Sequence, residues 1–419
     1  MEEKTYLCID MKSFFASVEC VERGLDPLTA LLVVADPSRG SGAICLAVTP
    51  ALKALGVRNR CRLYEIPPHI RYITALPHMK RYMEVSADIY STYLKYISPQ
   101  DIHVYSVDEC FLDVTSYLKL YQLSPKEMVK LLTQAVYKQT GITATAGIGT
   151  NLFLAKVALD ITAKHAEDHI GELNEESFKK LIWTHQPITD VWGIGHGIAA
   201  RLEKYGVTDL FGITQLDEKV LYKEFGVNAE YLIDHAYGKE PCTIQDIHDY
   251  KAKSSSISNG QILFENYRYD DALLVMKEMV DMLSLELVEK HSVVDSISLS
   301  IGYASEKDKA TGGSRKLNGF TNSYTKLVTQ FEELYRSTTK VHTPIRRINI
   351  SLNNLHDEAM ETVSLFDDPT VLTKEKKLQE TMLSIKKRYG KNAVLKGMNY
   401  QEKATARQRN KLTGGHNSE

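Results

Sequence analysis

Three acidic residues carry the clearest chemical signal in this sequence. Asp108 and Glu109 stand side by side in "YSVDECFLDV", residues 105–114, whose other residues are mostly good strand formers. Asp10 ends the apolar run "YLCID" far upstream. Buried carboxylates are costly unless something compensates their charge. Two divalent cations about 3.5–4 Å apart would do so, and such a pair stabilises the attacking and leaving oxygens in phosphoryl transfer.

Mg²⁺ is the ion that suits this set of ligands, because it prefers oxygen donors and keeps open positions for substrate phosphates. Each acid also has a plain structural interpretation. Asp108 and Glu109 can close a hairpin turn, where acidic residues are common. Asp10 can cap the N-terminus of the helix that follows it.

The segments that must position these acids alternate between strand and helix periodicity. The order is β-α, an insertion, then α-β-β-α-β-α, which is close to a ferredoxin-like split βαβ fold with one helical face. In such a sheet Asp10 ends the first strand, and Asp108 and Glu109 lie at the junction of two neighbouring strands. The three carboxylates can therefore meet, and the predicted fold class is α/β (α+β), multidomain. Strands are predicted at 4–10, 29–36, 42–50, 101–106, 109–114 and 142–150, and helices at 12–23, 50–56, 78–97, 124–141 and 151–164.

Residues 185–245 have a different, helical character. The turn Gly193–Ile194–Gly195 opens a helix in "VWGIGHGIAARL". Such a turn exposes backbone N–H groups to a phosphate. It is typical of the helix-hairpin-helix motif, which holds the DNA backbone without reading its sequence, although plain helical hairpins use the same turn. The polar stretch 245–260 predicts a linker, and 256–355 predict a second α/β unit with four strands and two helices.

The composition is that of a soluble globular protein of several domains, with 43% hydrophobic and 25% charged residues. A net charge of −2 gives no general attraction to nucleic acid. Residues 371–419, however, hold twelve Lys or Arg against four Glu. This basic tail either contacts a polyanion or is a solvated helix.

The cysteines and the termini indicate a cytoplasmic protein. None of the six cysteines has a partner at metal-ligand spacing, so a zinc site is not expected. The N-terminus lacks a signal-peptide pattern, and no apolar run approaches membrane length. We therefore expect reduced thiols in the cytoplasm.

Five motifs, in this order, resemble those of the Y-family translesion DNA polymerases, and most closely the UmuC-like branch of Gram-positive bacteria and their mobile elements. The motifs are "CIDMKSFFASVE", "HMKRYMEVSADIY", "YSVDECFLDV", "AGIGTNLFLAKVALD" and "VWGIGHGIAARL". The resemblance covers nearly the entire chain and implies a right-hand polymerase. Its parts would be a palm at 1–23 and 81–170, fingers at 24–80, a thumb at 171–240, a linker at 241–255, a little finger at 256–358, and a clamp-binding segment with a basic tail at 359–419.

The resemblance also implies the roles of the acidic residues. Asp10 and Asp108 would hold both of two Mg²⁺ ions. Glu109 would serve the ion that activates the primer 3′-hydroxyl, and the carbonyl of Met11 the ion on the triphosphate. The substrates would be deoxynucleoside triphosphates.

Further residues are implied as contacts of the incoming nucleotide. Phe15 falls at the aromatic steric-gate position, where its ring would crowd a ribose 2′-hydroxyl; the alternative is a plain core residue. Phe14 would offer its backbone N–H to the triphosphate, and Lys53 and Lys164 would be phosphate cations. Either Thr49 or Pro50 stands where many members have a Tyr near the phosphates. The chain also departs from the family at 12, where a Lys replaces the usual Asp or Asn.

The implied partners are primer–template DNA, the sliding clamp and accessory proteins of the SOS response. In "TVSLFDD", Leu365 and Phe366 resemble the end of a clamp-binding peptide, with Thr362 in place of the usual Gln. The alternative is that this pair folds back onto the little finger. DNA contacts are expected from Gly193, Ile194, Gly195, Lys251, Lys253, Arg315, Lys316, Arg346 and Arg347.

The predicted function is that of a DNA-directed DNA polymerase that acts in DNA damage tolerance. A non-catalytic DNA-binding factor and another two-metal palm enzyme, such as a nucleotide cyclase, are the rival interpretations. The three acids favour an enzyme, because a binding module has no need to keep repelling charges together. The glycine turn and the second α/β unit argue against the cyclase.

Overall fold

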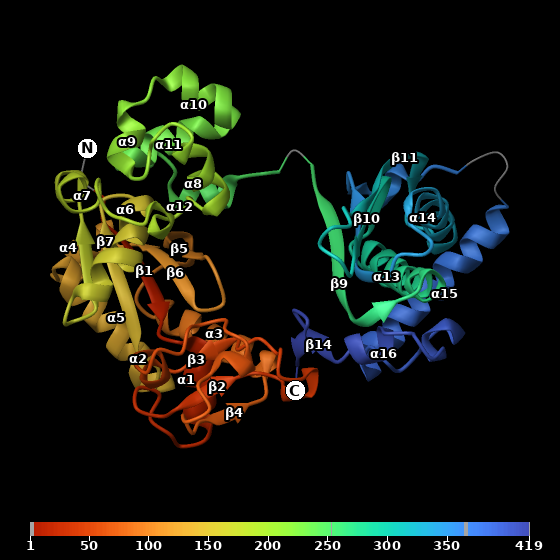
Figure 1. Ribbon diagram of the computed structural model, residues 1–419, viewed down its shortest axis with the longest axis horizontal. Helices are drawn as coiled ribbons and strands as arrows, with labels where there is room; N and C mark the ends of the chain where they lie inside the picture. The colour runs from red at the N-terminus through yellow and green to blue at the C-terminus, as the bar shows by residue number, and fades with distance from the viewer. Residues whose placement is uncertain (1–3, 253, 364–367, 419) are drawn as a thin grey trace. The chain divides into compact units, whose positions relative to one another are not determined.

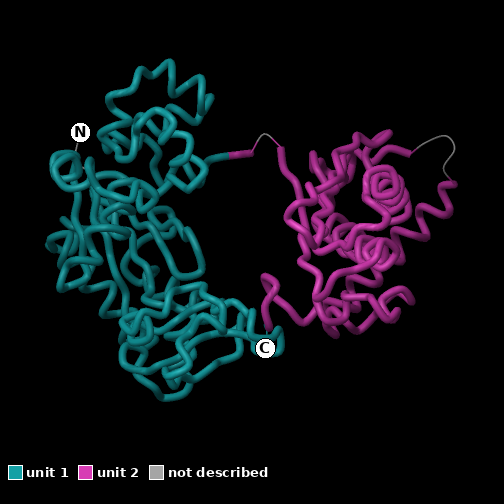
Figure 2. The backbone as a smooth tube through the Cα atoms, viewed as in Figure 1, with its two compact units in different colours: residues 1–250, 418–419 teal, residues 251–417 magenta. Residues whose placement is uncertain are grey.

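The computed structural model describes residues 4–252, 254–363 and 368–418. The chain forms two compact units, residues 1–250 with 418–419 and residues 251–417, which Figure 2 shows in different colours. The first unit has three parts: a central sheet, a small inserted sheet and a group of short helices. Each unit is described by itself below.

The central sheet of the first unit has the strand order β5-β6-β1-β7-β8 (Figure 1). β1 lies in the middle and runs antiparallel to both β6 and β7. The first four strands have the ferredoxin-like order that the periodicity predicts, and β8 extends the sheet at one edge. The strands are β1 Tyr6–Met11, β5 Ile102–Val104, β6 Glu109–Asp113, β7 Ala144–Gly149 and β8 Ile170–Leu173.

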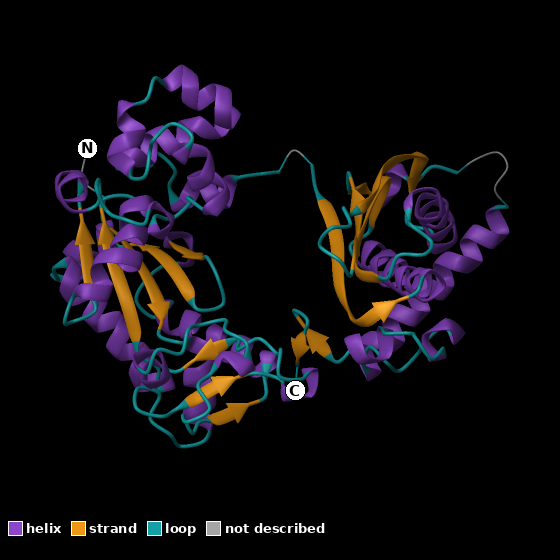
Figure 3. Cartoon of the chain, in the orientation of Figure 1, coloured by secondary structure: helices purple, strands orange, loops and turns teal. Residues whose placement is uncertain are grey.

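Helices cover both faces of this sheet, as Figure 3 shows. Leu7 and Ile9 belong to a hydrophobic cluster shared with α3 and α5. Tyr6 and Cys8, which point the other way, pack with α6 and α12. The expectation of a single helical face is therefore wrong: an extra helical layer buries the second face of β1. The helices are α1 Phe14–Glu22, α3 Met79–Tyr93, α4 Thr115–Tyr121, α5 Pro125–Thr140, α6 Leu152–Val157 and α12 Ile244–Asp249.

Helix α12 lies inside the predicted linker, so that part of the linker prediction is wrong. Thr243 caps the helix, because its side chain accepts a hydrogen bond from the backbone N–H of Asp246. Ile244 is 2% exposed and packs against the β1 side chains. One buried isoleucine and a capping box suffice to fix a helix that is too short to show periodicity.

The inserted sheet and the helical group have cores of their own. In the inserted sheet β2 pairs with β3 and β4. Its elements are β2 Leu32–Val34, β3 Ala47–Val48, α2 Pro50–Ala54 and β4 Ile73–Ala75. The helical group consists of α7 Glu175–Leu181, α8 His196–Glu203, α9 Leu210–Gln215, α10 Glu218–Phe225 and α11 Ala229–Ala236.

The second unit is a four-stranded antiparallel sheet in the order β11-β10-β12-β9 with two long helices on one face. The numbers of long strands and long helices agree with the four strands and two helices predicted for this unit. The elements are β9 Ser256–Tyr267, α13 Tyr269–Glu289, β10 Ser292–Tyr303, β11 Thr311–Thr321, α14 Tyr324–Thr338 and β12 Ile345–Asn353, with the short β13 His356–Asp357 paired to β10.

The basic tail is packed onto α13 rather than left as a polar end. The first part of the basic tail is helical: α15 is Pro369–Tyr389, and α16 Ala406–Arg409, β14 Leu412–Thr413 and β15 His416–Asn417 follow. The buried carboxylate of Glu278 accepts hydrogen bonds from Asn399 Nδ2 at 2.8 Å and from the backbone N–H of Thr405 at 2.8 Å. Lys396 pairs with Asp281 at 2.7 Å. These contacts hold the tail, and a polar sequence alone could not reveal them.

Across the described residues, none of the helices combines the length and the apolar character that a membrane crossing requires.

Candidate active site

The three predicted acids converge where β1 ends and β6 begins. Asp10 lies directly opposite Glu109 in the antiparallel pairing of the two strands. The backbone N–H of Met11 donates to the carbonyl of Asp108 at 3.0 Å. Asp10 and Glu109 therefore share one face of the sheet, with Asp108 in the turn beside them. Residues almost a hundred positions apart meet here because β1 is the central strand.

The crowding of these carboxylates is visible in the acidity of Asp10. Burial, followed by the charges of Asp108 and Glu109, raises the pKa of Asp10 to about 8. Lys156 opposes this rise but does not cancel it. The site thus has less positive than negative charge, and this excess of negative charge favours the binding of a cation.

Lys156 is a member of the site that the sequence did not reveal. It lies on α6, and its Nζ is 2.8 Å from Glu109 Oε1 and 2.9 Å from Asp160 Oδ1. Burial lowers the pKa of Lys156, but Asp160 and Glu109 outweigh burial and raise it above its ordinary value. The thiol of Cys8 donates to the same Glu109 oxygen at 3.0 Å. The lysine therefore supplies one positive charge to the acidic cluster.

The local backbone explains how Lys156 reaches the acids. Helix α6 continues into a π-helical turn at Ala158–Thr162, which carries Asp160. On the sheet below, Gly147 lets α6 approach closely, because a Cβ there would lie 2.1 Å from the carbonyl oxygen of Ala155. A Lys and an Asp at i and i+4 within the apolar run "FLAKVALD" were the available signal.

The donor set fits a hard divalent cation, although the side chains must turn to bind one. The carboxylates and the Met11 carbonyl are all oxygen donors, as Mg²⁺ requires. Asp108 Oδ1 accepts a hydrogen bond from the Ser106 hydroxyl at 2.8 Å, and Glu109 is held by Lys156. Within residues 4–252, 254–363 and 368–418, no three His, Cys, Asp or Glu side chains are already arranged to hold a metal ion.

Phe15 lies on α1, the helix that follows β1, and stacks on a second aromatic ring. Its ring centroid is 4.5 Å from that of Tyr82 on α3, with 16° between the ring planes. Tyr82 is fully buried, whereas Phe15 is half-buried. Phe14 is 2% exposed and belongs to the core. Tyr82 was not predicted as a site residue, because its position on a long helix indicated only packing.

The residues predicted to contact the nucleotide differ in their burial and in their hydrogen-bond partners. Lys53 Nζ donates to Ser13 Oγ at 2.9 Å, immediately before Phe14 and Phe15. Burial lowers the pKa of Lys53, and the charge of Asp10 opposes this. Thr49 is completely buried, and its Oγ1 accepts a hydrogen bond from the backbone N–H of Leu32 at 3.1 Å. Lys164 lies on an exposed 3₁₀ turn.

The glycine turn of the helical group is anchored by its central residue. Ile194 is 4% exposed and packs into the helical core. Gly193 has a φ of +89°, which a residue with a side chain rarely adopts. Gly195 is the N-cap of α8. The turn can therefore offer backbone groups only from the two glycines, and Ile194 fixes its position.

The second unit separates the predicted DNA contacts by the face of its sheet. Lys316 lies opposite Ser296, and Arg347 lies opposite Gly302, on the face that the long helices leave uncovered. Arg315 lies opposite the buried Ile297 and pairs with Glu333 of α14 at 2.7 Å. Arg315 therefore contributes to the helical side, not to the open face. Two more predicted contacts, Lys251 and Arg346, are exposed and half-buried respectively, and Lys253 lies outside the described residues.

Leu365 and Phe366 also lie outside the described residues. The chain that leads to them leaves from the edge of the second unit. Thr362 donates its backbone N–H to the carbonyl of Phe320 at 2.9 Å, and its Oγ1 accepts from the N–H of Phe320 at 3.1 Å.

Comparison with solved structures identifies the class of fold. The chain superposes on a "Y-family DNA polymerase chimera Dbh-Dpo4(243-245)-Dbh" with a TM-score of 0.66, over 84% of this chain and 99% of the other, at 22% identity. The match spans both units, so the architecture is that of a Y-family polymerase.

Comparison of sequences identifies the family. Residues 9–160 match the impB/mucB/samB family, and residues 254–365 match the C-terminal domain of that family. The "Putative UV-damage repair protein UvrX" of Bacillus subtilis is 31% identical over 99% of this chain and 98% of its own. "DNA polymerase IV 2" of Halalkalibacterium halodurans is 29% identical over 99% of both chains. The chain belongs to the impB/mucB/samB family, that is, to the Y-family translesion DNA polymerases, as the five motifs predicted.

Proposed function

We propose that this chain is a template-directed DNA polymerase of the translesion type, which adds deoxynucleotides to a primer 3′ end opposite damaged template bases. Family membership supports the class of reaction, and two of the relatives are named for polymerase activity and for repair of UV damage. The observation that carries the proposal is the pairing of Asp10 with Glu109 beside Asp108, with a raised pKa at Asp10.

In this proposal Asp10, Asp108, Glu109 and the Met11 carbonyl hold two Mg²⁺ ions. The ions would supply positive charge for the attacking and leaving oxygens of phosphoryl transfer. The chain's own part is to present oxygen donors on two adjacent strands and to hold them together despite their like charges. Lys156 performs the second task, since its ammonium group pairs with Glu109.

The incoming nucleotide would bind between α1 and the inserted sheet. Lys53 is exposed, with its Nζ bonded to Ser13 Oγ and under the influence of the Asp10 charge, and a cation there would attract a triphosphate. Phe15 would select the sugar, because a ring fixed under the ribose rejects a 2′-hydroxyl by overlap. Phe14 would offer its N–H, and Lys164 would add a second cation. Thr49 is buried, so we assign it to shaping this site rather than to contact.

Duplex DNA would be held through its phosphates. The Gly193–Gly195 turn would offer backbone N–H groups, and Lys316 and Arg347 would contribute from the open face of the second sheet. Leu365 and Phe366 would tether the enzyme to the sliding clamp, with SOS accessory proteins as further partners. The enzyme would act on DNA in the cytoplasm.

Primer extension on a UV-damaged template with Mg²⁺ tests the proposal. Glu109→Gln should abolish nucleotide addition and retain DNA binding. Asp113→Asn is a matched control, because Asp113 is an acid on the same strand whose Oδ1 accepts hydrogen bonds from the backbone N–H and the hydroxyl of Thr115. It should extend primers at the parental rate. DNA binding by the parent without any extension would instead support the rival, a non-catalytic DNA-binding factor.

A further inference from the structure

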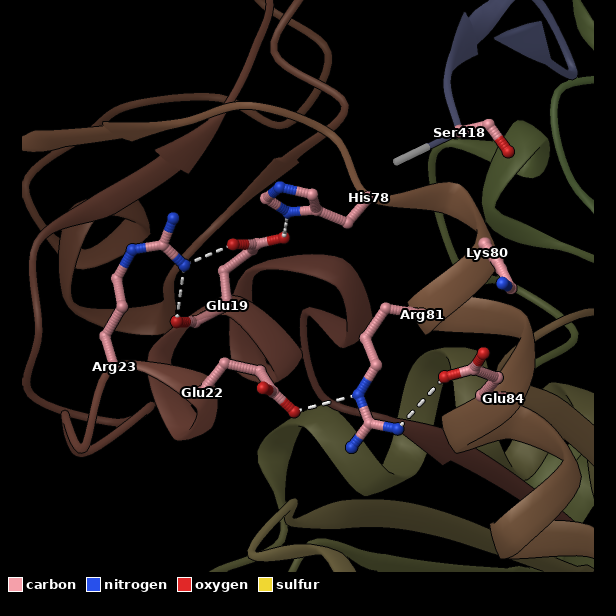
Figure 4. A pocket seen from close by; sticks show the side chains of 8 residues that line it. All are labelled: Glu19, Glu22, Arg23, His78, Lys80, Arg81, Glu84 and Ser418. Atoms are coloured by element: carbon pink, nitrogen blue, oxygen red, sulfur yellow. Dashed lines mark hydrogen bonds and ion pairs between the residues drawn. The ribbon is translucent and has the colours of Figure 1, made fainter. Parts of the chain in front are cut away.

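One buried carboxylate lies next to the proposed sugar gate and has no part in the acidic cluster. Glu19 is on α1, one helical turn after Phe15, and is 2% exposed. Its Oε1 accepts a hydrogen bond from the Tyr82 hydroxyl at 2.6 Å and lies 2.7 Å from His78 Nδ1. Its Oε2 pairs with Arg23. Figure 4 shows how His78 and Arg23 reach this carboxylate from either side.

These partners keep the carboxylate ionised inside the protein. Burial raises the pKa of Glu19, but the hydrogen bonds from Tyr82, His78 and Arg23 outweigh burial and bring it below the ordinary value. An ionised acceptor makes short, strongly directional hydrogen bonds. The Tyr82 hydroxyl is therefore fixed at one point, on a ring that is otherwise enclosed by apolar neighbours.

The fixed Tyr82 ring is the surface on which Phe15 rests. The two rings are nearly parallel, with 4.5 Å between their centroids. Phe15 is the more exposed of the two residues. One face of its ring packs against Tyr82 and is therefore turned toward the protein. If Tyr82 could tilt, Phe15 could retreat toward α3. A stacked pair of rings alone resists this weakly, since such contacts contribute about 0.5–1.5 kcal/mol.

We propose that Glu19 is a positioning residue for sugar selection: by holding the Tyr82 hydroxyl, it prevents Phe15 from yielding to a ribose 2′-hydroxyl. The proposal rests on the proposed function of Phe15 as the sugar gate. A merely structural tie between α1 and α3 would stabilise the fold but would affect deoxyribonucleotides and ribonucleotides equally. A positioning role changes their ratio.

The test measures kcat/KM for a deoxynucleotide and for the matching ribonucleotide in the full chain. Tyr82→Phe keeps the ring and removes the hydroxyl, and Glu19→Gln removes the charged acceptor. Each should lower discrimination against the ribonucleotide about tenfold, equivalent to about 1.4 kcal/mol. The double variant should lose no more than the larger single loss, because both changes break one hydrogen bond.

Glu22→Gln is the matched control. Glu22 is on the same helix, and its carboxylate pairs with Arg81 at the surface (Figure 4). It should leave the discrimination ratio unchanged. Phe15→Ala is measured in parallel and should lower the ratio far more than any of these variants.

The outcomes separate the two proposals. An unchanged ratio in Phe15→Ala would overturn the sugar gate itself. A lowered ratio in Phe15→Ala together with parental ratios in Tyr82→Phe and Glu19→Gln would overturn only the role of Glu19. If Glu19→Gln does not fold, Tyr82→Phe decides, because it keeps the buried ring and loses one atom.

Discussion

Replacing Lys156 by Met tests whether the acidic cluster needs an internal counter-charge. Methionine keeps most of the length and the apolar stem of the lysine side chain and removes its ammonium group. Glu109 is 10% exposed at its side chain, and Lys156 Nζ lies 2.8 Å from it. Without Lys156, the Glu109 carboxylate keeps its hydrogen bond from the Cys8 thiol. A thiol is a weak donor.

The structure gives the size of the expected loss. Removing one partner of a buried ion pair costs about 3–5 kcal/mol, because the other charge stays buried. The second partner, Asp160, is 29% exposed and can be solvated, so it adds little. We therefore expect a loss of about 3 kcal/mol at pH 7, or about 6–12 °C in Tm for a unit of this size.

Urea unfolding followed by tryptophan fluorescence measures this loss. The two tryptophans, Trp183 and Trp192, belong to the first unit, so their signal reports that unit alone. Lys130→Met is the matched control, since Lys130 is exposed on α5. It should change the free energy of unfolding by no more than about 0.5 kcal/mol.

A double-mutant cycle decides the cause. Glu109→Gln in the Lys156→Met background removes the uncompensated charge, so the double variant should be more stable than Lys156→Met alone. We expect a coupling free energy of about 2 kcal/mol. Losses that add to within about 0.5 kcal/mol, or a Lys156→Met variant as stable as the parent, would refute an ion pair between these residues.

Three further predictions concern other parts of the chain. Lys316→Ala with Arg347→Ala should weaken DNA binding on every sequence and reduce the slope of log affinity against log salt by about 2; an unchanged slope in filter binding would exclude the open face. Glu19→Gln should destabilise the chain at neutral pH, but the difference should vanish as pH falls through the lowered folded pKa of Glu19, because stability from that carboxylate is fully present only above its unfolded value of 4.5; a pH-independent difference in urea titrations would contradict this. Leu365→Ala with Phe366→Ala should remove stimulation of primer extension by a sliding clamp and spare basal extension; loss of basal extension would favour the fold-back interpretation.

The fold was predictable where burial imposes a period on the sequence. Strand β1 has apolar residues on both faces, and α5 has its Ser124 cap and Gly141 stop in the sequence itself. These signals are local, so the order of elements and the meeting of Asp10 with Asp108 and Glu109 follow from them. The cover on the second face was predictable only in part: a helix was predicted at 151–164, where α6 lies, but α12 is six residues long and shows no period.

The partners of the site residues were less predictable, for a physical reason. Lys156 and Glu19 are charged residues in helices, and most charged residues in helices face water. Their roles depend on tertiary contacts: the side chain of Lys156 pairs with Glu109, and that of Glu19 accepts a hydrogen bond from Tyr82. A single sequence contains the residue types but not the distances between them. The tail shows the same limit, since Glu278 is buried only because Asn399 and Thr405 donate to it.

Charge balance explains why the acidic site can fold and still bind cations. Lys156 compensates Glu109 and is shared with Asp160, so one positive charge serves two carboxylates. Asp10 receives too little of it, and its pKa stays near 8. The fold is thus stable enough to hold the carboxylates together, but it leaves them short of positive charge. Complete neutralisation of the acids would remove their attraction for a cation. Without Lys156, repulsion between the carboxylates would oppose their close approach. Because one lysine is shared between two carboxylates, the negative charge of the site is compensated only in part. A site that binds charged substrates needs this partial compensation.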